Sequence, residues 1–275
     1  MSKDTTIRVI SAIVGLVVFF LVVLSNSIVF NIALGVIILF MLLEFLHAFK
    51  YGITLKLTAL AASLFIIYSF CSYKYDILAL TLISFIAVLI TESIFLHKTI
   101  SFNDISNVLF ATLYISIFSS FIALMRSFGE FEIYYLCLLF TCAWISDTGA
   151  YFMGRFFGRR KLAPDISPKK TIAGSIGGIA FAAVGCMILG AVSVFISKSN
   201  PNYIVLAIIG AFGSCLAQIG DLGASIIKRS CGVKDFGNIM PGHGGMLDRF
   251  DSVIFIAPFI FFACYFLETF GIYLF

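Results

Sequence analysis

Long apolar segments, separated by short polar ones, follow one another along almost the whole chain. Most of them contain about 20 residues, the length that an α-helix needs to cross the hydrocarbon core of a bilayer. Because backbone polar groups find no water inside a bilayer, each segment is expected to be helical. The pattern predicts about nine spans, with approximate bounds 7–25, 27–46, 57–73, 77–96, 105–125, 133–154, 172–197, 203–223 and 252–272.

The composition leads to the same fold class. Of the 275 residues, 61% are hydrophobic and 12% are charged, whereas about a quarter of the residues in a soluble domain are charged. A soluble enzyme and a disordered protein are therefore excluded, and the unbroken apolar runs exclude a porin-type barrel. The predicted fold is all-α, a polytopic integral membrane protein with a single membrane-embedded domain over residues 1–275. Within it, residues 1–130 are expected to form a mainly apolar helical part and residues 131–275 a catalytic part.

The distribution of Lys and Arg predicts the orientation of the chain. Basic residues favour the cytoplasmic ends of membrane helices. With nine spans and a cytoplasmic N-terminus, 15 of the 18 basic residues lie on the cytoplasmic side and 3 lie outside. We therefore expect an N-in, C-out protein of the cytoplasmic (inner) membrane, with its active site facing the cytoplasm.

Two glutamates interrupt the apolar N-terminal half. Glu44 and Glu92 each lie near the predicted inner end of a span. A carboxylate at that depth is expected to reach the lipid headgroups, and the alternative is a packing or functional partner within the protein.

Asp147 is the first acidic residue of a more polar region that begins after residue 140. It lies about two helical turns from Arg155, the nearest basic residue, and is too short to reach the membrane surface easily. A functional carboxylate in a water-filled pocket is favoured over a capped structural aspartate.

A basic loop follows Asp147. Its basic residues are Arg155, Arg159, Arg160, Lys161, Lys169 and Lys170. Topology alone, or attraction to anionic lipid, would explain such a loop. The stretch Ser167-Pro168-Lys169-Lys170-Thr171 is more specific, because basic side chains just before a small-residue helix suit the binding of phosphate at the helix N-terminus.

The segment from residue 213 to residue 251 carries a dense group of charges. Its charged residues and histidine are Asp221, Asp235, Asp248, Asp251, Lys228, Arg229, Lys234, Arg249 and His243. On a helix, Asp221, Ser225 and Lys228 would share one face. Asp248 and Asp251 would likewise face together if a helix begins near Gly245. Carboxylates gathered at one site are usually compensated by a hard cation such as Mg²⁺, which prefers oxygen ligands and substrate phosphates.

A glycine-rich turn, Pro241-Gly242-His243-Gly244-Gly245, lies in the same segment. Such a turn would let a polyanion approach bare backbone N–H groups. His243 is either a hydrogen-bonding residue of this turn or a catalytic group. Carboxylates, cations and glycines together predict metal-assisted transfer at a phosphorus centre of a lipid-linked substrate.

These residues resemble the signature of the phosphatidate cytidylyltransferase family, whose members are also called CDP-diacylglycerol synthases. The match fills nearly every specified position of Ser225-x-x-Lys228-Arg229-x4-Lys234-Asp235-x-Gly237-x2-Met240-Pro241-x-His243-Gly244-Gly245-x2-Asp248-Arg249-x-Asp251. Gln218-x-Gly220-Asp221-Leu222 and Asp147-Thr148-x-Ala150-Tyr151 are also similar to that family. Ile172 and Ala173 depart from it, since the family often has an aromatic residue and then Glu or Gln there.

The resemblance implies a nucleotidyltransferase that converts CTP and phosphatidate into CDP-diacylglycerol and pyrophosphate, with Mg²⁺ as cofactor. It implies Asp221, Asp248 and Asp251 as metal ligands. The implied catalytic residues are these three with Lys228, Arg229 and His243. The implied substrate-binding residues are Asp147, Ser225, Lys234, Asp235, Arg249, Lys169 and Lys170. A second, monovalent cation is left open.

Two other functions are kept as alternatives. One is a cytidylyltransferase or a CTP-dependent kinase that acts on another lipid. The other is an ion-coupled transporter, which would spread its polar residues along several spans. The expected partners are CTP, phosphatidate and membrane lipid, with no nucleic acid. A homodimer and the acyl-chain preference are left open by the sequence.

Overall fold

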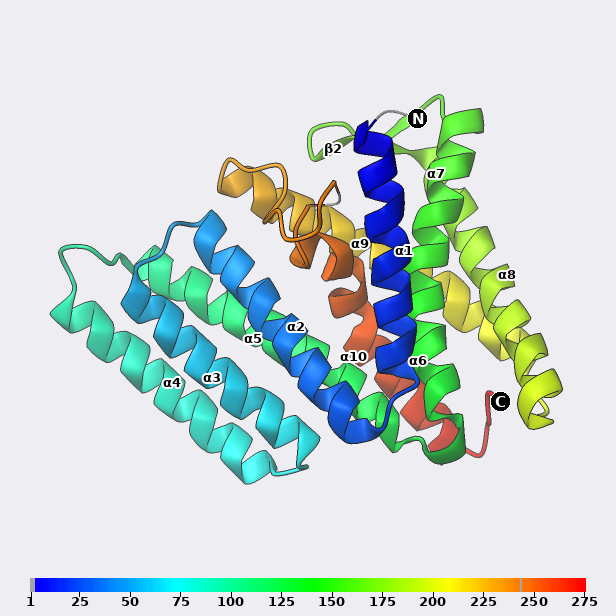
Figure 1. Ribbon diagram of the computed structural model, residues 1–275, viewed down its shortest axis with the longest axis horizontal. Coiled ribbons are helices and arrows are strands. Elements are labelled where there is room, and N and C mark those ends of the chain that lie inside the picture. The colour runs from blue at the N-terminus through cyan, green and yellow to red at the C-terminus, as the bar shows by residue number, and fades with distance from the viewer. Residues whose placement is uncertain (1–2, 243) are drawn as a thin grey trace. The chain divides into compact units, whose positions relative to one another are not determined.

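The computed structural model describes residues 3–242 and 244–275, and these are mostly helical (Figure 1). The chain divides into two compact units. Unit 1 comprises Met1–Leu124 and Cys231–Phe250, and unit 2 comprises Met125–Ser230 and Asp251–Phe275. The segment 231–250, which holds much of the charged signature, therefore belongs with the N-terminal helices.

Unit 1 is built from five helices and the segment 231–250. The helices are α1 (Lys3–Val23), α2 (Ser27–Ala48), α3 (Ile53–Cys71), α4 (Tyr75–Phe95) and α5 (Phe102–Leu124). In Figure 1, α3 lies alongside both α4 and α5, and α2 packs on α3 and α5. Fully buried Ile38, Ile66 and Ile115 lie between these helices. Ser116 donates a hydrogen bond of 2.8 Å to Ser63, which joins α5 to α3 inside this apolar core.

Unit 2 contains the remaining helices and two short strands. In chain order its elements are η1 (Met125–Ser127), η2 (Gly129–Phe131), α6 (Glu132–Phe140), η3 (Thr141–Ile145), α7 (Ser146–Phe157), β1 (Lys161–Ala163), β2 (Ser167–Thr171), α8 (Ile172–Ser197), α9 (Tyr203–Ser230) and α10 (Leu247–Thr269). The first turn of α10 falls in the unit 1 segment, and the rest of the helix falls in unit 2.

Eight helical segments of the described residues are long and apolar enough to cross a membrane. They are Ser27–Ala48, Ile53–Cys71, Tyr75–Phe95, Phe102–Ser127, Gly129–Phe157, Ile172–Ser197, Tyr203–Ser230 and Leu247–Thr269. They correspond to eight of the nine predicted spans, and the region of the first span contains the shorter apolar segment Ile10–Val23. The prediction of a helical polytopic membrane protein is confirmed.

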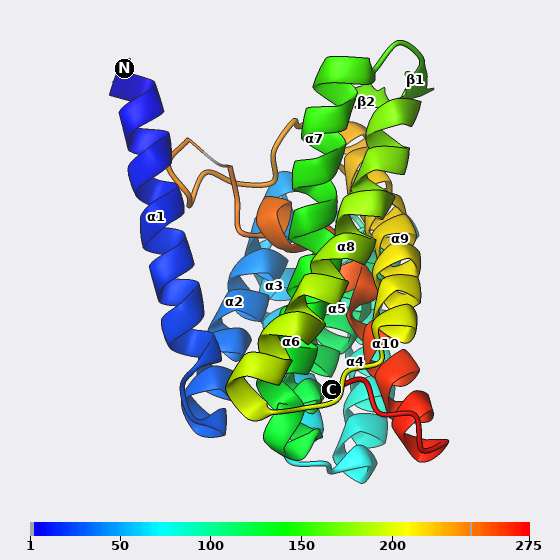
Figure 2. The same ribbon diagram turned by 90° about the vertical axis from the view of Figure 1, so that its right-hand side faces the viewer.

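Small residues let the helices of unit 2 approach one another closely. Helices α7, α8 and α9 lie side by side in Figure 2. A Cβ atom added to Gly149 of α7 would lie 2.5 Å from the Cβ atom of Phe181 on α8. One added to Gly210 of α9 would lie 2.7 Å from the carbonyl oxygen of Ala182 on α8. Close approach of this kind is the usual basis of helix association in lipid, where the hydrophobic effect between helices is absent.

One turn of π-helix, η3, joins α6 to α7, so that a single span contains all three elements. The wider turn lies directly before Ser146 and Asp147. Turns of this kind are frequent at functional sites because they change which side chains share a helix face. Here the change occurs at the position from which the polar part of unit 2 begins.

The basic loop after α7 forms a small antiparallel hairpin, an exception to the predicted all-α fold. Lys161 of β1 pairs with Thr171 of β2, and Ala163 pairs with Ser167. Helix α8 begins directly after β2, and the side chain of Thr171 accepts a hydrogen bond of 3.1 Å from the backbone N–H of Gly174. This N-cap ends the strand and starts the helix.

Candidate active site

A polar cavity of about 380 Å³ lies in unit 2 between α7, the β1–β2 hairpin, the first turn of α8 and the later part of α9. Its polar lining includes Asp147, Lys169, Lys170, Ser175, Gln218 and Asp221. Asp147 comes from α7, the two lysines from β2, Ser175 from the first turn of α8, and the last two residues from α9. The hairpin and three helices thus bring predicted residues from two separate polar segments into one cavity.

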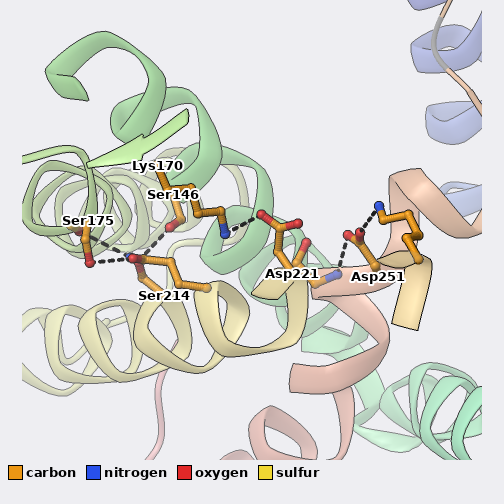
Figure 3. A network of polar contacts seen from close by, with 9 residues as sticks. Ser146, Lys170, Ser175, Ser214, Asp221 and Asp251 are labelled. Carbon is orange, nitrogen blue, oxygen red and sulfur yellow. Dashed lines mark hydrogen bonds and ion pairs between the residues drawn. The ribbon is translucent and has the colours of Figure 1, made fainter. Parts of the chain in front are cut away.

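Lys170 and Asp221 form an ion pair across this cavity, as Figure 3 shows. Each side chain is about a quarter exposed. Arg155 of α7 also lines the cavity, and its guanidinium donates a hydrogen bond of 2.9 Å to the hydroxyl of Tyr151. With Lys169, this gives the cavity three cationic side chains, the residue types that bind phosphate groups.

A chain of polar contacts ties α7, α8 and α9 together beside the cavity (Figure 3). The amide nitrogen of Gln218 donates to the backbone carbonyl of Ser175 (3.2 Å) and to the hydroxyl of Ser214 (3.3 Å). The hydroxyls of Ser214 and Ser146 are 2.6 Å apart. Satisfied polar groups of this kind fix the relative positions of helices in an apolar environment. Sequence reasoning did not select Gln218 as a site residue, although an amide inside a predicted span was a signal for it.

Asp251 of α10 is a second acidic centre of unit 2. It is 7% exposed, and its carboxylate lies 3.7 Å from the ammonium of Lys228 on α9. The carboxylates of Asp221 and Asp147 are close enough to interact electrostatically with Asp251. Three predicted acidic residues and Lys228 are therefore brought together within unit 2.

Helix α9 extends further than the predicted span, which ended at residue 223. It continues to Ser230, so Lys228 and Arg229 occupy its last turn, beyond the predicted end of the span. Basic side chains in a last turn interact favourably with the helix dipole, which explains the added turns. Asp221, Ser225 and Lys228 thus lie on one helix, as predicted, and Arg229 is exposed.

In unit 1, the signature segment is ordered around the carboxylate of Asp248. This oxygen, Oδ2, accepts hydrogen bonds from the backbone N–H groups of Phe236 (2.8 Å) and Gly245 (3.0 Å). The predicted glycine turn is present, since Gly242 and Gly244 have φ angles of 77° and 85°, a region that favours glycine. Asp248 therefore has a structural role within its own loop.

Three further predicted residues of this segment, Lys234, Asp235 and Arg249, are exposed in unit 1. His243 lies outside the described residues. The predicted approach of Asp221 to Asp248 concerns two different units and stays a prediction.

Glu44 of α2 does not reach the lipid headgroups, so that expectation was wrong. It is 5% exposed, and its two carboxylate oxygens accept hydrogen bonds from the backbone N–H groups of Met246 (2.9 Å) and Leu247 (2.8 Å). The alternative, a partner within the protein, is confirmed. Its partners lie about 200 residues further along the chain, so no local pattern could have indicated them.

A second hollow in unit 2, of about 580 Å³, is almost entirely apolar. Its lining combines Thr141 and Ile145 of η3 with the α8 residues Phe181, Val184, Gly185 and Ile188. Val184 and Ile188 are both exposed. This apolar groove follows α8 away from the first turn of that helix, where Ser175 lines the polar cavity.

The residues that the structure describes contain no group of three or more His, Cys, Asp and Glu side chains arranged to hold a metal ion. Asp221 and Asp251 instead each face a lysine. Such a donor set suits Mg²⁺, which commonly uses one or two carboxylates together with substrate phosphates.

Comparison with known proteins agrees with the chemistry of these residues. The model of the cytidylyltransferase family matches residues 6–267. The phosphatidate cytidylyltransferase of Bacillus subtilis (strain 168) is 33% identical over 267 residues, which cover 94% of this chain and 97% of that protein. The phosphatidate cytidylyltransferase of Staphylococcus saprophyticus is 33% identical over 262 residues, covering 92% and 96%. That of Staphylococcus haemolyticus is 38% identical over 180 residues, or 66% of each chain. Matches over nearly the whole length show that this chain belongs to the cytidylyltransferase family.

Proposed function

We propose that this protein is a phosphatidate cytidylyltransferase, which transfers the cytidylyl group of CTP to phosphatidate and gives CDP-diacylglycerol and pyrophosphate. The observation that carries the proposal is the polar cavity of unit 2, in which Asp147, Asp221 and Lys170 meet beside apolar helices. The family and the names of its similar members supply the substrate class. The protein is on this basis a nucleotidyltransferase of phospholipid biosynthesis.

The reaction is a substitution at phosphorus. An oxygen of the phosphatidate phosphate forms a bond to the α-phosphorus of CTP, and the bond from that phosphorus to the β-phosphate oxygen breaks to release pyrophosphate. Such a step needs little covalent chemistry from the protein, mainly positioning and charge neutralisation. Lys169, Lys170 and Arg155 can bind phosphate oxygens in the cavity, and Lys228 can stabilise charge beside Asp251. The exposed Arg229, Lys234 and Arg249 are retained as further phosphate-binding candidates.

Mg²⁺ is the proposed cofactor. Asp221 and Asp251 would hold it within unit 2, and Asp248 is retained as a third proposed ligand. When bound, Mg²⁺ would neutralise phosphate charge as a Lewis acid. Lys170 and Lys228, which pair with Asp221 and Asp251, compensate the charge of these carboxylates and are also candidates to bind substrate phosphates.

The apolar groove on α8 is the proposed binding site for an acyl chain of phosphatidate. It is lined by exposed apolar side chains, which suit a lipid tail. It is lined by η3, which leads directly into the α7 helix of Asp147, and by α8, which supplies Ser175 to the polar cavity, so one lipid could use both. A polar headgroup at the end of the helices and tails along them match the layers of a bilayer.

The proposed orientation is N-in and C-out in the cytoplasmic membrane. It is supported by the excess of basic residues in the segments assigned to the cytoplasm. In this orientation the cavity opens to the compartment that holds CTP. An ion-coupled transporter is disfavoured, because Asp147, Lys169, Lys170 and Asp221 meet at one cavity.

The direct test uses the purified protein in detergent with CTP labelled in its cytosine ring, Mg²⁺ and phosphatidate. We expect a cytidine-containing product that partitions into organic solvent, with pyrophosphate released in equal amount. A phosphorylated lipid that contains no cytidine would instead indicate a CTP-dependent kinase. If the product forms only with another lipid phosphate, that lipid and not phosphatidate is the substrate.

A further inference from the structure

We propose that Glu44 is a positioning residue that holds the signature segment and the start of α10 in the geometry needed for the reaction; the proposal rests on the function proposed above. Glu44 lies in an apolar helix far from the signature in sequence, and nothing in its surroundings along the chain suggests a role. Its contacts within unit 1 give it one.

The first contact is with the beginning of α10. The first N–H groups of a helix have no partner within the helix. Glu44 supplies partners from another helix: Oε1 accepts from Met246, and Oε2 accepts from Leu247, the first residue of α10. A carboxylate at this end of a helix also interacts favourably with the helix dipole. Glu44 therefore determines where α10 begins and how its first turn is held against α2.

The second contact is with two signature glycines. A Cβ atom added to Gly245 would lie 2.5 Å from Oε2 of Glu44, and one added to Gly237 would also overlap the carboxylate. These glycines lie on either side of the turn that contains Gly242 and Gly244. The loop thus closes around the Glu44 carboxylate, and side chains at the two flanking positions would prevent it from closing.

The third observation links Glu44 to Asp248. Asp248 is one residue after Leu247, and it closes the same loop by accepting from Phe236 and Gly245. Phe236 in turn stacks on Phe45, the neighbour of Glu44, with ring centroids 6.0 Å apart. Glu44 attaches the loop to α2, and Asp248 closes the loop on itself. A displaced Glu44 would therefore displace Asp248.

The chemistry requires a carboxylate of this length. Glutamine has one acceptor oxygen and one NH₂ group, which is a donor. Its NH₂ group would face one of the two backbone N–H donors, and that N–H group would lose its acceptor. Aspartate keeps the charge and both acceptor oxygens but is one methylene shorter. Glu44→Gln should consequently disturb the loop more than Glu44→Asp.

The experiment compares the wild type with Glu44→Gln, Glu44→Asp and the control Glu92→Gln. Glu92 is a half-buried glutamate of α4 in the same unit, and it accepts a hydrogen bond of 2.5 Å from Thr58. We measure kcat, KM for CTP, melting temperature, and amide hydrogen exchange by mass spectrometry over residues 232–250. Exchange reports directly on the N–H groups that Glu44 binds.

We expect Glu44→Gln to lower kcat at least tenfold, with KM for CTP within twofold and only a small decrease in melting temperature. A lower kcat with an unchanged KM is typical of a group that acts only on the transition state. Exchange should accelerate within residues 232–250, most of all in the peptide that contains Met246 and Leu247, and should stay unchanged in the other helices. Glu44→Asp should recover part of kcat, and Glu92→Gln should match the wild type.

Three results would overturn the proposal: a kcat of Glu44→Gln within twofold of the wild type, unchanged exchange in the loop, or faster exchange in all helices. If Glu44→Gln does not fold, the same measurements on Glu44→Asp test the proposal. If neither variant folds, Glu44 is needed for folding and the proposed positioning role is overturned. An inactive wild type would refute the proposed function, and the exchange comparison would still test the contact of Glu44 with the loop.

Discussion

The ammonium of Lys228 lies 3.7 Å from the carboxylate of Asp251, and both side chains are almost fully buried. Lys228 comes from the last turn of α9 and Asp251 from α10. Burial makes a charge expensive unless a partner of opposite charge is near. The pair therefore offsets part of the cost of burying the Asp251 carboxylate, at a place where a cation and a phosphate are proposed to bind.

Removal of this lysine charge should damage both folding and activity. Lys228→Met leaves a buried carboxylate without its ammonium, so we expect a lower melting temperature and at least a tenfold loss in kcat, about 1.4 kcal/mol of barrier. The double variant Lys228→Met with Asp251→Asn should recover the melting temperature, because no unpaired charge remains, but not the activity. Recovery of activity in the double variant would show that the pair is structural only.

Lys170 should act on substrate phosphate more than on stability. It is about a quarter exposed and pairs with Asp221 in the cavity. We expect Lys170→Gln to raise KM for CTP and to lower kcat/KM at least tenfold, with little change in melting temperature. The control is Lys161→Gln, since Lys161 is exposed on β1 of the same hairpin and does not line the cavity. Equal effects of both variants would show that Lys170 contributes only to the positive charge of the hairpin and does not bind a substrate phosphate specifically.

Asp248→Asn separates the loop role of Asp248 from its proposed metal role. The amide oxygen of asparagine can still accept from Phe236 and Gly245, whereas the negative charge is lost. If Asp248 is a metal ligand, activity should fall at least tenfold, about 1.4 kcal/mol, and higher Mg²⁺ should restore part of it. Asp235→Asn, in the same loop but exposed, should respond less to added Mg²⁺. Full activity of Asp248→Asn at low Mg²⁺ would leave Asp248 with its loop role alone.

A bulky residue in the apolar groove should affect long acyl chains selectively. Val184 lines the groove and is exposed, so Val184→Trp would fill part of it without burying a polar group. We expect kcat/KM to fall at least fivefold for a phosphatidate with long chains, and to stay within twofold for a short-chain analogue. A loss that is equal for both lipids would place the acyl chains elsewhere.

The orientation of the chain can be tested with reporters. A reporter fused after Phe275 should be external, and one inserted near Pro164, between the two strands of the basic hairpin, should be cytoplasmic. The physical reason is the excess of basic residues in the segments assigned to the cytoplasm. Both reporters on the same side would contradict the predicted number of spans.

The sequence by itself determined the fold class and the chemistry. Apolar segments of membrane-spanning length predict helices wherever they occur, because the cost of an unpaired backbone group in lipid is local to each segment. The charged residues 213–251 and their glycines likewise indicated phosphate and metal chemistry without knowledge of their neighbours. Asp147, Lys169 and Lys170 were selected from the earlier polar segment and Asp221 from this one, and the structure places all four around one cavity.

Only the tertiary structure decided which of these groups meet. Lys170 pairs with Asp221 and Lys228 with Asp251, choices that depend on how β2, α9 and α10 pack. The role of Glu44 was not visible in the sequence, where a glutamate near the end of a span suggests contact with headgroups. Its partners are 202 and 203 residues away. Local sequence determines what each segment can bury, whereas the partner of a buried polar group is determined by the packing of distant segments around it.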